Sequence, residues 1–294
     1  MRIEDLVEEV RRLDVDGIRS LLDEAEEVLR EEWTGGVVRG VEGRSAVIIG
    51  DVHGDFATLT EILRREDVCR LLEGDGRLVF LGDIVDRGEG QVESINLVLK
   101  LKTLFREKVV FIRGNHEPPP QLPPYPHDFP YVLKLRYGAD GERLYQRYFR
   151  IFQLLPHAAT TANRIFLVHG GLPAGEYTLD DLVNPDIRVL EDLLWSDPFE
   201  GRGCYPSYRG AGHQFGYDIT EGFLRRNGLV MVVRGHEPCE GFKVNHEYRV
   251  LTLFSRTGPP YFNGAAGYLT IPLSSELRPI DAIKNVKLVY GSGG

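Results

Sequence analysis

Short apolar runs alternate with longer amphipathic stretches along the first part of the chain. The runs 46–49, 78–81 and 109–112 are rich in Val, Ile, Leu and Phe, which is typical of buried strands. Between them, residues 55–73 and 91–105 place apolar side chains at helical spacing, and each stretch predicts one helix. Because a βαβ unit takes roughly 30 residues, this alternation predicts an α/β protein whose first three strands share one sheet.

The same alternation continues to the end of the chain. Residues 1–32 predict two amphipathic helices ahead of the first strand. Later helices are expected at 142–155 and 218–227 and in a short segment that closes with 192–198. Later strands are expected at 164–168, 229–233, 248–254, 267–273 and 286–290. No linker interrupts the pattern, so the 294 residues predict one domain overall.

A polar motif follows each of the first three strands. The motifs are Gly50–Asp55 (GDVHGD), Gly82–Gly88 (GDIVDRG) and Arg113–Glu117 (RGNHE). Two later strands end in a similar way, at HGGL and RGHE. Sites in open α/β sheets form outside the carboxyl ends of the strands, so we expect six side chains to lie together. They are Asp51, His53, Asp83, Asn115, His169 and His236.

The six side chains suit a pair of metal ions. Carboxylate, amide oxygen and imidazole match divalent ions such as Mn, Fe, Co or Zn, and the lack of thiolates argues against a closed structural zinc site. Six ligands are too many for one ion with an open position, whereas two ions can share a carboxylate. Asp83 is the expected shared ligand because it lies between the two sets in the sequence. One ion would take Asp51 and His53, and the other Asn115, His169 and His236.

Two neighbouring metal ions favour displacement at phosphorus. They lower the pKa of a bridging water from about 15.7 toward about 7, so that hydroxide attacks phosphorus directly and no phosphoenzyme forms. The leaving alkoxide then needs a proton, and His116 is the candidate general acid, with Asp86 holding its tautomer. Arginine forks match phosphate oxygens, so Arg87 is the first candidate to bind phosphate and Arg209 the second.

Composition narrows the classes of function. The net charge of −9 and the isoelectric point near 5.5 argue against a general nucleic-acid binder. The chain has no run of about 18 apolar residues, so we expect no membrane span, and its charged first residues do not form a secretory signal. Cys69, Cys204 and Cys239 lack metal-site spacing, which fits a cytoplasmic protein, with a Cys204–Cys239 bond left open.

Taken in order, GDVHGD, GDIVDRG, RGNHE, HGGL and RGHE resemble the motifs of the phosphoprotein phosphatase family of serine/threonine phosphatases. The segment DLLWSDP, residues 192–198, is similar to the type 1 and type 2A branch. The resemblance runs from about residue 45 to residue 270. It implies the metallophosphoesterase (calcineurin-like) fold, a central β-sandwich of mixed sheets flanked by helices. On this fold, helices in residues 1–40 would pack on a catalytic domain of residues 41–290.

The resemblance also implies roles for individual residues. The family motifs place the metal ligands on the six side chains named above, with Asn115 also facing the phosphate. They place the general acid on His116, its supporting carboxylate on Asp86, and the phosphate-binding arginines on Arg87 and Arg209. The implied cofactors are two divalent metal ions per chain, with Mn expected in vitro and Fe, Zn or Co as alternatives.

Two segments depart from the family pattern. Near its carboxyl end the family carries Ser-Ala-Pro-Asn-Tyr-Cys, whose Tyr approaches the phosphate, whereas this chain reads SRTGPPY from Ser255 to Tyr261. We expect Tyr261 to replace that tyrosine, displaced by two positions. Residues 118–130 are rich in proline, which predicts a stiff, extended loop. This loop either walls the active-site cleft or serves as a rigid surface connector.

The leading hypothesis is a metal-dependent protein serine/threonine phosphatase. It would act as a monomeric catalytic chain on phosphorylated proteins, with regulatory proteins as further partners. A second hypothesis is a phosphohydrolase of the same chemistry for small molecules such as dinucleoside polyphosphates. A third is a catalytically dead scaffold that binds partners, which the complete set of ligands disfavours. The acidic charge and the complete DRG and GNHE motifs also disfavour a nuclease.

Overall fold

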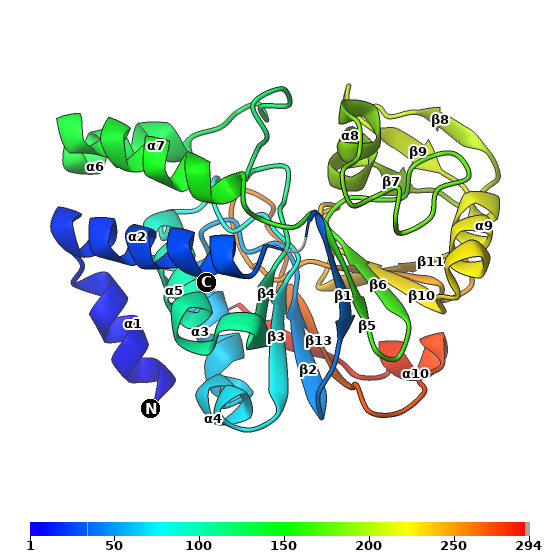
Figure 1. Ribbon diagram of the computed structural model, residues 1–294, viewed down its shortest axis with the longest axis horizontal. Coiled ribbons are helices and arrows are strands. Elements are labelled where there is room, and N and C mark those ends of the chain that lie inside the picture. Colours follow the sequence, from blue (N-terminus) through cyan, green and yellow to red (C-terminus); the bar gives the residue numbers. More distant parts are fainter. Residues whose placement is uncertain (34, 292–294) are drawn as a thin grey trace.

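Two β-sheets lie face to face at the centre of the protein in a computed structural model that describes residues 1–33 and 35–291 (Figure 1). Within this part, the first sheet has the strand order β14 (Val286–Tyr290), β13 (Ala265–Pro272), β2 (Ser45–Ile49), β3 (Gly76–Phe80) and β4 (Val109–Phe111). The second sheet has the order β1 (Val37–Val41), β5 (Ala158–Thr161), β6 (Ile165–Val168), β10 (Met231–Arg234), β12 (Val250–Leu253) and β11 (Phe242–Asn245). Parallel and antiparallel pairs occur in both sheets.

Alternation along the strands forms the core between the sheets. Ile48 and Val79 point inward and join a fully buried cluster with Leu167 and Val233 of the second sheet. Their neighbours, such as Phe80, point outward and pack under helices. Each such side chain stabilises the fold by about 1.5–3 kcal/mol relative to an exposed one. A strand covered on both faces is apolar throughout, and for this reason the short runs in the sequence predicted buried strands.

Helices cover the outer faces of both sheets (Figure 1). Over the first sheet lie α1 (Ile3–Arg11), α2 (Val15–Glu31), α3 (Phe56–Arg65), α4 (Val68–Glu73), α5 (Gln91–Phe105), α6 (Phe129–Tyr137) and α7 (Ala139–Phe152). Over the second sheet lie α8 (Ile187–Trp195) and α9 (Tyr217–Asn227). A short turn η1 (Arg106–Lys108) precedes β4, and α10 (Pro279–Ile283) precedes β14. A small third sheet is formed by β7 (Asp197–Pro198), β9 (His213–Phe215) and β8 (Cys204–Pro206).

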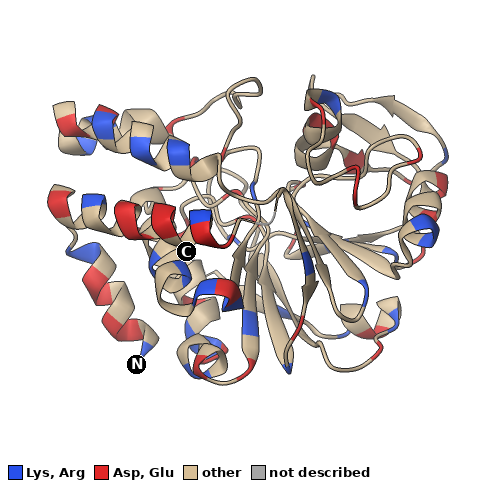
Figure 2. Ribbon diagram, in the orientation of Figure 1, with Lys and Arg blue, Asp and Glu red and all other residues tan. Residues whose placement is uncertain are grey.

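The first two helices belong to the same core as the sheet beneath them. Leu21 and Leu22 of α2 are buried in one hydrophobic cluster with Phe80 of β3. The helix begins at a side-chain cap, because Asp14 accepts a hydrogen bond from the backbone N–H of Gly17 at 2.8 Å. The buried residues of these two helices are all apolar, and charged residues are frequent in the helices and few in the strands (Figure 2).

The structure corrects several sequence predictions. The single helix expected over 55–73 is two helices, α3 and α4, separated at Asp67, whose φ of +43° is left-handed and cannot continue a helix. The extended segment expected over 118–130 ends at Asp128, because α6 begins at Phe129 with Pro130 in its first turn, where the missing N–H costs nothing. Residues 37–41, for which the sequence predicted neither a helix nor a strand, form β1.

Two further observations concern the cysteines and the helices. The three cysteines are free, so the Cys204–Cys239 bond left open by the sequence is not formed. Among the described residues, no helix combines the length and the apolar character that a membrane crossing needs.

Candidate active site

The carboxyl ends of five strands meet at one edge of the sandwich. The loops after β2, β3 and β4 carry Asp51, Asp83 and Asn115, and those after β6 and β10 carry His169 and His236. The two sheets are joined at this edge by a β-bridge between Asp51 and Phe254. Parallel neighbouring strands therefore bring together residues that are distant in the sequence.

The backbone of this edge is strained. Four residues of this edge have positive φ values, in a region that residues other than glycine rarely adopt. They are His53 (+43°), Asp83 (+53°), Asp86 (+67°) and His236 (+69°). Such conformations cost about 1–3 kcal/mol each and persist where the surrounding structure holds them. The loops after β3 and β4 also lie very close, since a Cβ on Gly114 would stand 2.2 Å from Asp83 Oδ1. Only glycine fits there.

The carboxylate of Asp83 lies between two groups of predicted ligands. Its Oδ2 is 3.4 Å from His53 Nε2 and also 3.4 Å from His169 Nε2. On the first side, Asp51 Oδ2 is 3.8 Å from His53 Nε2. Asp83 also belongs to two potential metal-binding groups, one with His53 and His116 and the other with His169 and His236. A carboxylate in this position is within reach of both groups and fits the predicted role of a ligand shared by two ions.

The second group converges on the side chain of Asn115. Its Oδ1 is 2.9 Å from His169 Nε2 and 3.0 Å from His236 Nδ1. In two of the predicted ligands Nδ1 contacts a backbone carbonyl: His169 Nδ1 lies 2.9 Å from the carbonyl of Leu81, and His53 Nδ1 lies 2.9 Å from that of Val85. These contacts direct Nε2 of both rings toward the site, which is the orientation of metal-ligating histidines.

Burial and charge make the site suited to cations. Asp51 Oδ2 is buried without a hydrogen-bond partner. Burial, together with the charge of Asp83, raises the pKa of Asp51 to about 7. Burial lowers the pKa of His53 to about 3 and that of His236 well below its ordinary value, so both rings are neutral ligands near neutral pH. A divalent ion would offset the repulsion between the carboxylates and satisfy the orphaned oxygen, so these residues fit the metals that the family implies.

Glu117 supports the site from beneath, and sequence reasoning assigned it no role. Its carboxylate is fully buried and accepts hydrogen bonds from the backbone N–H groups of Asp83 at 2.7 Å, Ile84 at 2.9 Å and Gly114 at 3.1 Å. It therefore ties the loop after β3 to the loop after β4. Its position within RGNHE was the available signal, because the motif ends in this acidic residue.

His116 and Asp86 form a hydrogen-bonded pair beside the ligands. The Nδ1 atom of His116 contacts Asp86 Oδ2, and its backbone N–H donates to Asp83 Oδ1 at 2.9 Å. Burial lowers the pKa of His116, but the charges of Asp83 and Asp86 outweigh this effect and raise it above its ordinary value. The ring therefore tends to hold a proton, which a general acid must do before it can donate one.

The predicted phosphate-binding residues line the pocket above the ligands. This pocket has a volume of about 430 Å³ and is lined by His53, Asp83, Arg87, Asn115, His116, Tyr125, Trp195, Arg209, His236, Pro238, Pro260 and Tyr261. Arg209 is held by Asp197, with 2.7 Å between its Nε and the carboxylate, and Asp197 is also bound by the buried Arg234 at 2.9 Å. Tyr125 brings the Pro-rich segment to the rim of the pocket.

Tyr261 reaches the site despite its displacement in the sequence. Its ring lies over that of His53, with 5.7 Å between the ring centroids and 27° between their planes. The guanidinium of Arg256 lies on the same tyrosine ring, 5.2 Å from its centroid. The altered loop from Ser255 thus delivers an aromatic hydroxyl to the pocket.

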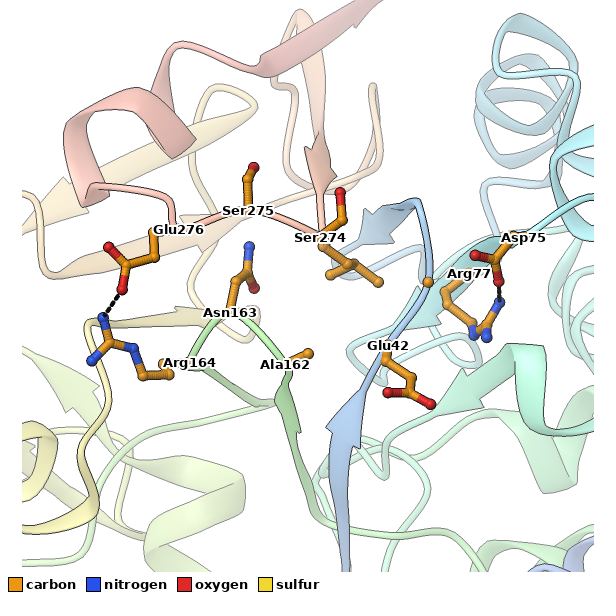
Figure 3. A pocket seen from close by; sticks show the side chains of 11 residues that line it. Glu42, Asp75, Arg77, Ala162, Asn163, Arg164, Ser274, Ser275 and Glu276 are labelled. Carbon is orange, nitrogen blue, oxygen red and sulfur yellow. Dashed lines mark hydrogen bonds and ion pairs between the residues drawn. The ribbon is translucent and has the colours of Figure 1, made fainter.

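A second, polar pocket has a volume of about 560 Å³, and Figure 3 shows the side chains that line it. Four of its five charged residues form ion pairs, Arg77 with Asp75 at 3.2 Å and Arg164 with Glu276 at 3.2 Å, and the fifth is Glu42. It lies near the amino ends of β2, β3 and β6, away from the ligands. Its paired charges single out no ligand.

Comparisons with known proteins agree with this geometry. The sequence model of the calcineurin-like phosphoesterase family matches residues 45–240. A probable serine/threonine-protein phosphatase of Encephalitozoon cuniculi is 33% identical over 299 residues, covering 96% of this chain and 63% of that protein. The chain thus spans less than two thirds of this relative's length.

Solved structures show the same likeness. A protein serine/threonine phosphatase from Saccharomyces cerevisiae, similar to human phosphatase PP5, superposes with a TM-score of 0.79 at 26% identity, covering 96% of this chain and 91% of that one. A putative diadenosine tetraphosphatase matches with a TM-score of 0.52 at 19% identity, covering 88% of this chain and all of that one, a likeness of fold alone. The predicted fold and family are confirmed: the chain belongs to the calcineurin-like phosphoesterase family, in its phosphoprotein phosphatase branch.

Proposed function

We propose that this chain is a metal-dependent protein serine/threonine phosphatase. The observation that carries the proposal is the sharing of Asp83 between two groups of ligands, next to the His116–Asp86 pair and within one pocket. Hydrolysis of a phosphate ester needs a nucleophile, charge compensation and a proton for the leaving group. The pocket offers residues for all three.

The ligand set suits two divalent ions. Asp51 and His53 would hold the first, Asn115, His169 and His236 the second, and Asp83 both. Bound ions would lower the pKa of a coordinated water toward neutrality and offset the charge of the phosphate. We propose Mn²⁺ as the ion that supports activity in vitro, with Fe, Zn or Co as alternatives, because the donors are nitrogen and oxygen without sulfur.

The protein side chains would orient the phosphate and complete the proton transfer. Arg87 and Arg209 line the pocket, where their planar guanidinium groups can each hold phosphate oxygens. The imidazole of His116 would donate a proton to the oxygen of the leaving serine or threonine. Asp86 keeps the Nδ1 proton of that ring directed away from the pocket, so that Nε2 faces the substrate. The hydroxyl of Tyr261 would add a donor to the phosphate.

Aromatic side chains at the rim of the pocket support a second candidate function. Tyr125 is 96% exposed and lines the same pocket as Trp195 and Tyr261. Flat rings at a pocket mouth can stack on a nucleoside base, as a dinucleoside polyphosphate hydrolase would need. The relatives named as serine/threonine phosphatases favour the protein phosphatase. We further propose a cytoplasmic location, where the free thiols of the chain remain reduced.

The test is Mn²⁺-dependent phosphate release from three substrates run side by side: a phosphoserine protein, a phosphotyrosine peptide and diadenosine tetraphosphate. His116→Asn serves as the matched variant. We expect preference for the phosphoserine protein and a loss of about 100-fold or more in the variant, the usual contribution of a general acid. Preference for the dinucleotide would replace the proposed function by the second candidate.

A further inference from the structure

His127, near the end of the Pro-rich segment, contacts Asp86, the carboxylate that is paired with the candidate acid His116. After residues 118–126, His127 directs Nδ1 at Asp86 Oδ2, 2.6 Å away. His116 contacts the same oxygen through its own Nδ1. One carboxylate oxygen therefore carries two imidazoles from segments that are eleven positions apart in the sequence. No motif in the sequence marks His127.

The other oxygen of Asp86 is held by the start of helix α6. Asp86 Oδ1 accepts the backbone N–H of Asp128 at 2.9 Å and that of Phe129 at 2.7 Å. Asp128 does not cap the helix with its own side chain, which accepts the backbone N–H of Arg87 at 3.1 Å instead. A distant carboxylate thus satisfies amide groups at the first turn, where helices favour negative charge.

His127 is itself fixed on its far side. Its Nε2 lies 2.9 Å from the hydroxyl of Tyr145 in α7, and the two rings are 5.6 Å apart. Burial raises the pKa of Tyr145 to about 12, so its hydroxyl keeps its proton and can donate it to Nε2. Nδ1 of His127 then carries the proton that Asp86 accepts. The chain of contacts runs from Tyr145 through His127 to Asp86 and on to His116.

Four donors leave the Asp86 carboxylate no freedom to rotate. Asp86 is fully buried, and both of its oxygens are saturated. Burial raises the pKa of Asp86, but the hydrogen bonds from His116 and His127 outweigh it and hold the pKa below its ordinary value. With His127 removed, Oδ2 would keep only His116 as a partner, and both groups could tilt. A small misplacement of a catalytic group can cost a large factor in rate.

We propose that His127 is a positioning residue that fixes Asp86 and, through it, the orientation of His116. The inference deepens the proposed function and rests on it. His127 is not in contact with substrate, because its Nε2 faces Tyr145 and it does not line the pocket. A metal ion between these side chains does not fit either. His127 Nδ1 and Asp86 Oδ2 lie 2.6 Å apart, whereas two atoms bound tetrahedrally to zinc lie roughly 3.3 Å apart.

The experiment compares two substrates that differ in their need for an acid. A phosphoserine peptide releases an alkoxide, which needs a proton, whereas p-nitrophenyl phosphate releases a stable phenolate that leaves without one. We expect His127→Ala to lower kcat on the peptide about tenfold, with KM within about twofold, and to change the nitrophenyl rate by less than about twofold. His127→Asn, which keeps an N–H donor near Asp86, should recover most of the loss.

Two controls separate positioning from a general structural effect. His213→Ala removes another imidazole from a carboxylate, since His213 Nδ1 lies 2.6 Å from Asp192, and it should change both substrates by the same factor. In an Asp86→Asn background, adding His127→Ala should cause little further loss, because the two act in one path. If His127→Ala is poorly folded, Tyr145→Phe keeps the ring in place and should show the same substrate split in weaker form.

A second measurement does not depend on catalysis. NMR on zinc-loaded protein follows the exchange of the His116 Nδ1 proton with solvent, which reports on the contact between His116 and Asp86. Faster exchange in His127→Ala supports positioning, and unchanged exchange contradicts it. Equal losses on both substrates, no recovery in His127→Asn, or additive losses with Asp86→Asn would overturn the proposal. A wild-type protein that releases no phosphate from phosphoserine would instead defeat the proposed function, and the exchange measurement would still decide the role of His127.

Discussion

The ring of Tyr261 lies over the ring of His53, 5.7 Å away and nearly parallel to it. His53 is a predicted metal ligand, so the tyrosine ring covers one side of the predicted metal site. Burial raises the pKa of Tyr261 to about 12, which keeps its hydroxyl protonated and able to donate. The loop that carries it differs in sequence from that of the family, yet an aromatic hydroxyl reaches the pocket.

Tyr261→Phe should separate the hydroxyl from the ring. We expect kcat/KM on a phosphoserine peptide to fall by about 10- to 100-fold, because one hydrogen bond to a charged phosphate contributes about 1.5–3 kcal/mol. Tyr261→Ala should cost more, since it also uncovers His53. Steady-state kinetics of the two variants are the measurement. Equal rates for wild type and Tyr261→Phe would show that only the ring matters.

Asn115→Ala should remove one metal ion and most of the turnover. Its Oδ1 is close to both His169 and His236, so the variant leaves the second ion without its central oxygen ligand. After equilibration with Mn²⁺ and gel filtration, elemental analysis should give about two ions per wild-type chain and about one in the variant. Asn163→Ala, at the opposite end of the sandwich, is the matched control and should retain both. Two ions in Asn115→Ala would contradict the ligand assignment.

The sequence predicted which edge of the sheet carries the candidate ligands because each of the first three polar motifs follows an apolar run. Each polar motif follows an apolar run that can only be a buried strand, as Ile48 before Asp51 illustrates, and parallel strands deliver their carboxyl ends to one edge. The β1 strand escaped prediction because Arg39 and Gly40 interrupt its apolar pattern, and its pairing with β5 joins segments about 120 residues apart. Such pairing is decided by tertiary contacts.

The contact between His127 and Asp86 could not be inferred in the same way. Nothing in the sequence near His127 indicates a partner, and a histidine in a Pro-rich loop is expected to be an ordinary surface residue. The contact exists because α6 starts directly after it and its first amides dock on Asp86. The sequence left two interpretations of residues 118–130 open, a wall of the active-site cleft and a rigid surface connector. The position of Tyr125 among the residues that line the pocket favours the first. Chain direction after a loop is set by packing, which local patterns do not encode.

Arg234→Met should destabilise the fold strongly. Arg234 is fully buried and binds Asp197 at 2.9 Å and the carbonyl of Gly170 at 2.5 Å. Burial raises the pKa of Asp197, and the charge of Arg234 is the main influence that lowers it again. The variant leaves the buried carboxylate of Asp197 with Arg209 as its remaining ion-pair partner, so we expect a loss of up to about 3–5 kcal/mol in the free energy of unfolding by urea. Arg278→Met, which breaks an exposed pair, should leave the midpoint unchanged.

Rescue would confirm the cause of that loss. Adding Asp197→Asn to Arg234→Met removes the buried charge that lost Arg234 as a partner and should restore part of the stability, although Arg209 then loses its own partner and activity should fall. A double variant as unstable as Arg234→Met alone would mean that lost packing, and not the broken ion pair, sets the cost.

His157 should make the stability depend on pH. Burial lowers its pKa to about 4 from an ordinary value of 6.5, and its Nε2 lies 2.6 Å from the carbonyl of Leu182, to which the neutral ring donates. Above pH 6.5 the ring is neutral in both states. As the pH falls from 6.5 to 4, the unfolded chain binds a proton that the folded protein does not. The free energy of unfolding should therefore fall by up to about 3 kcal/mol over this window.

His157→Gln isolates this contribution, because glutamine can still donate to Leu182 but does not titrate. Urea unfolding at a series of pH values from 7 to 4 should show the wild type losing stability faster than the variant, with the gap between the two curves closing or reversing toward pH 4. Other groups titrate equally in both proteins and cancel in the difference. Parallel curves would mean that the folded protein accepts a proton on His157 as readily as the unfolded chain, which would require the ring to have another acceptor or access to water.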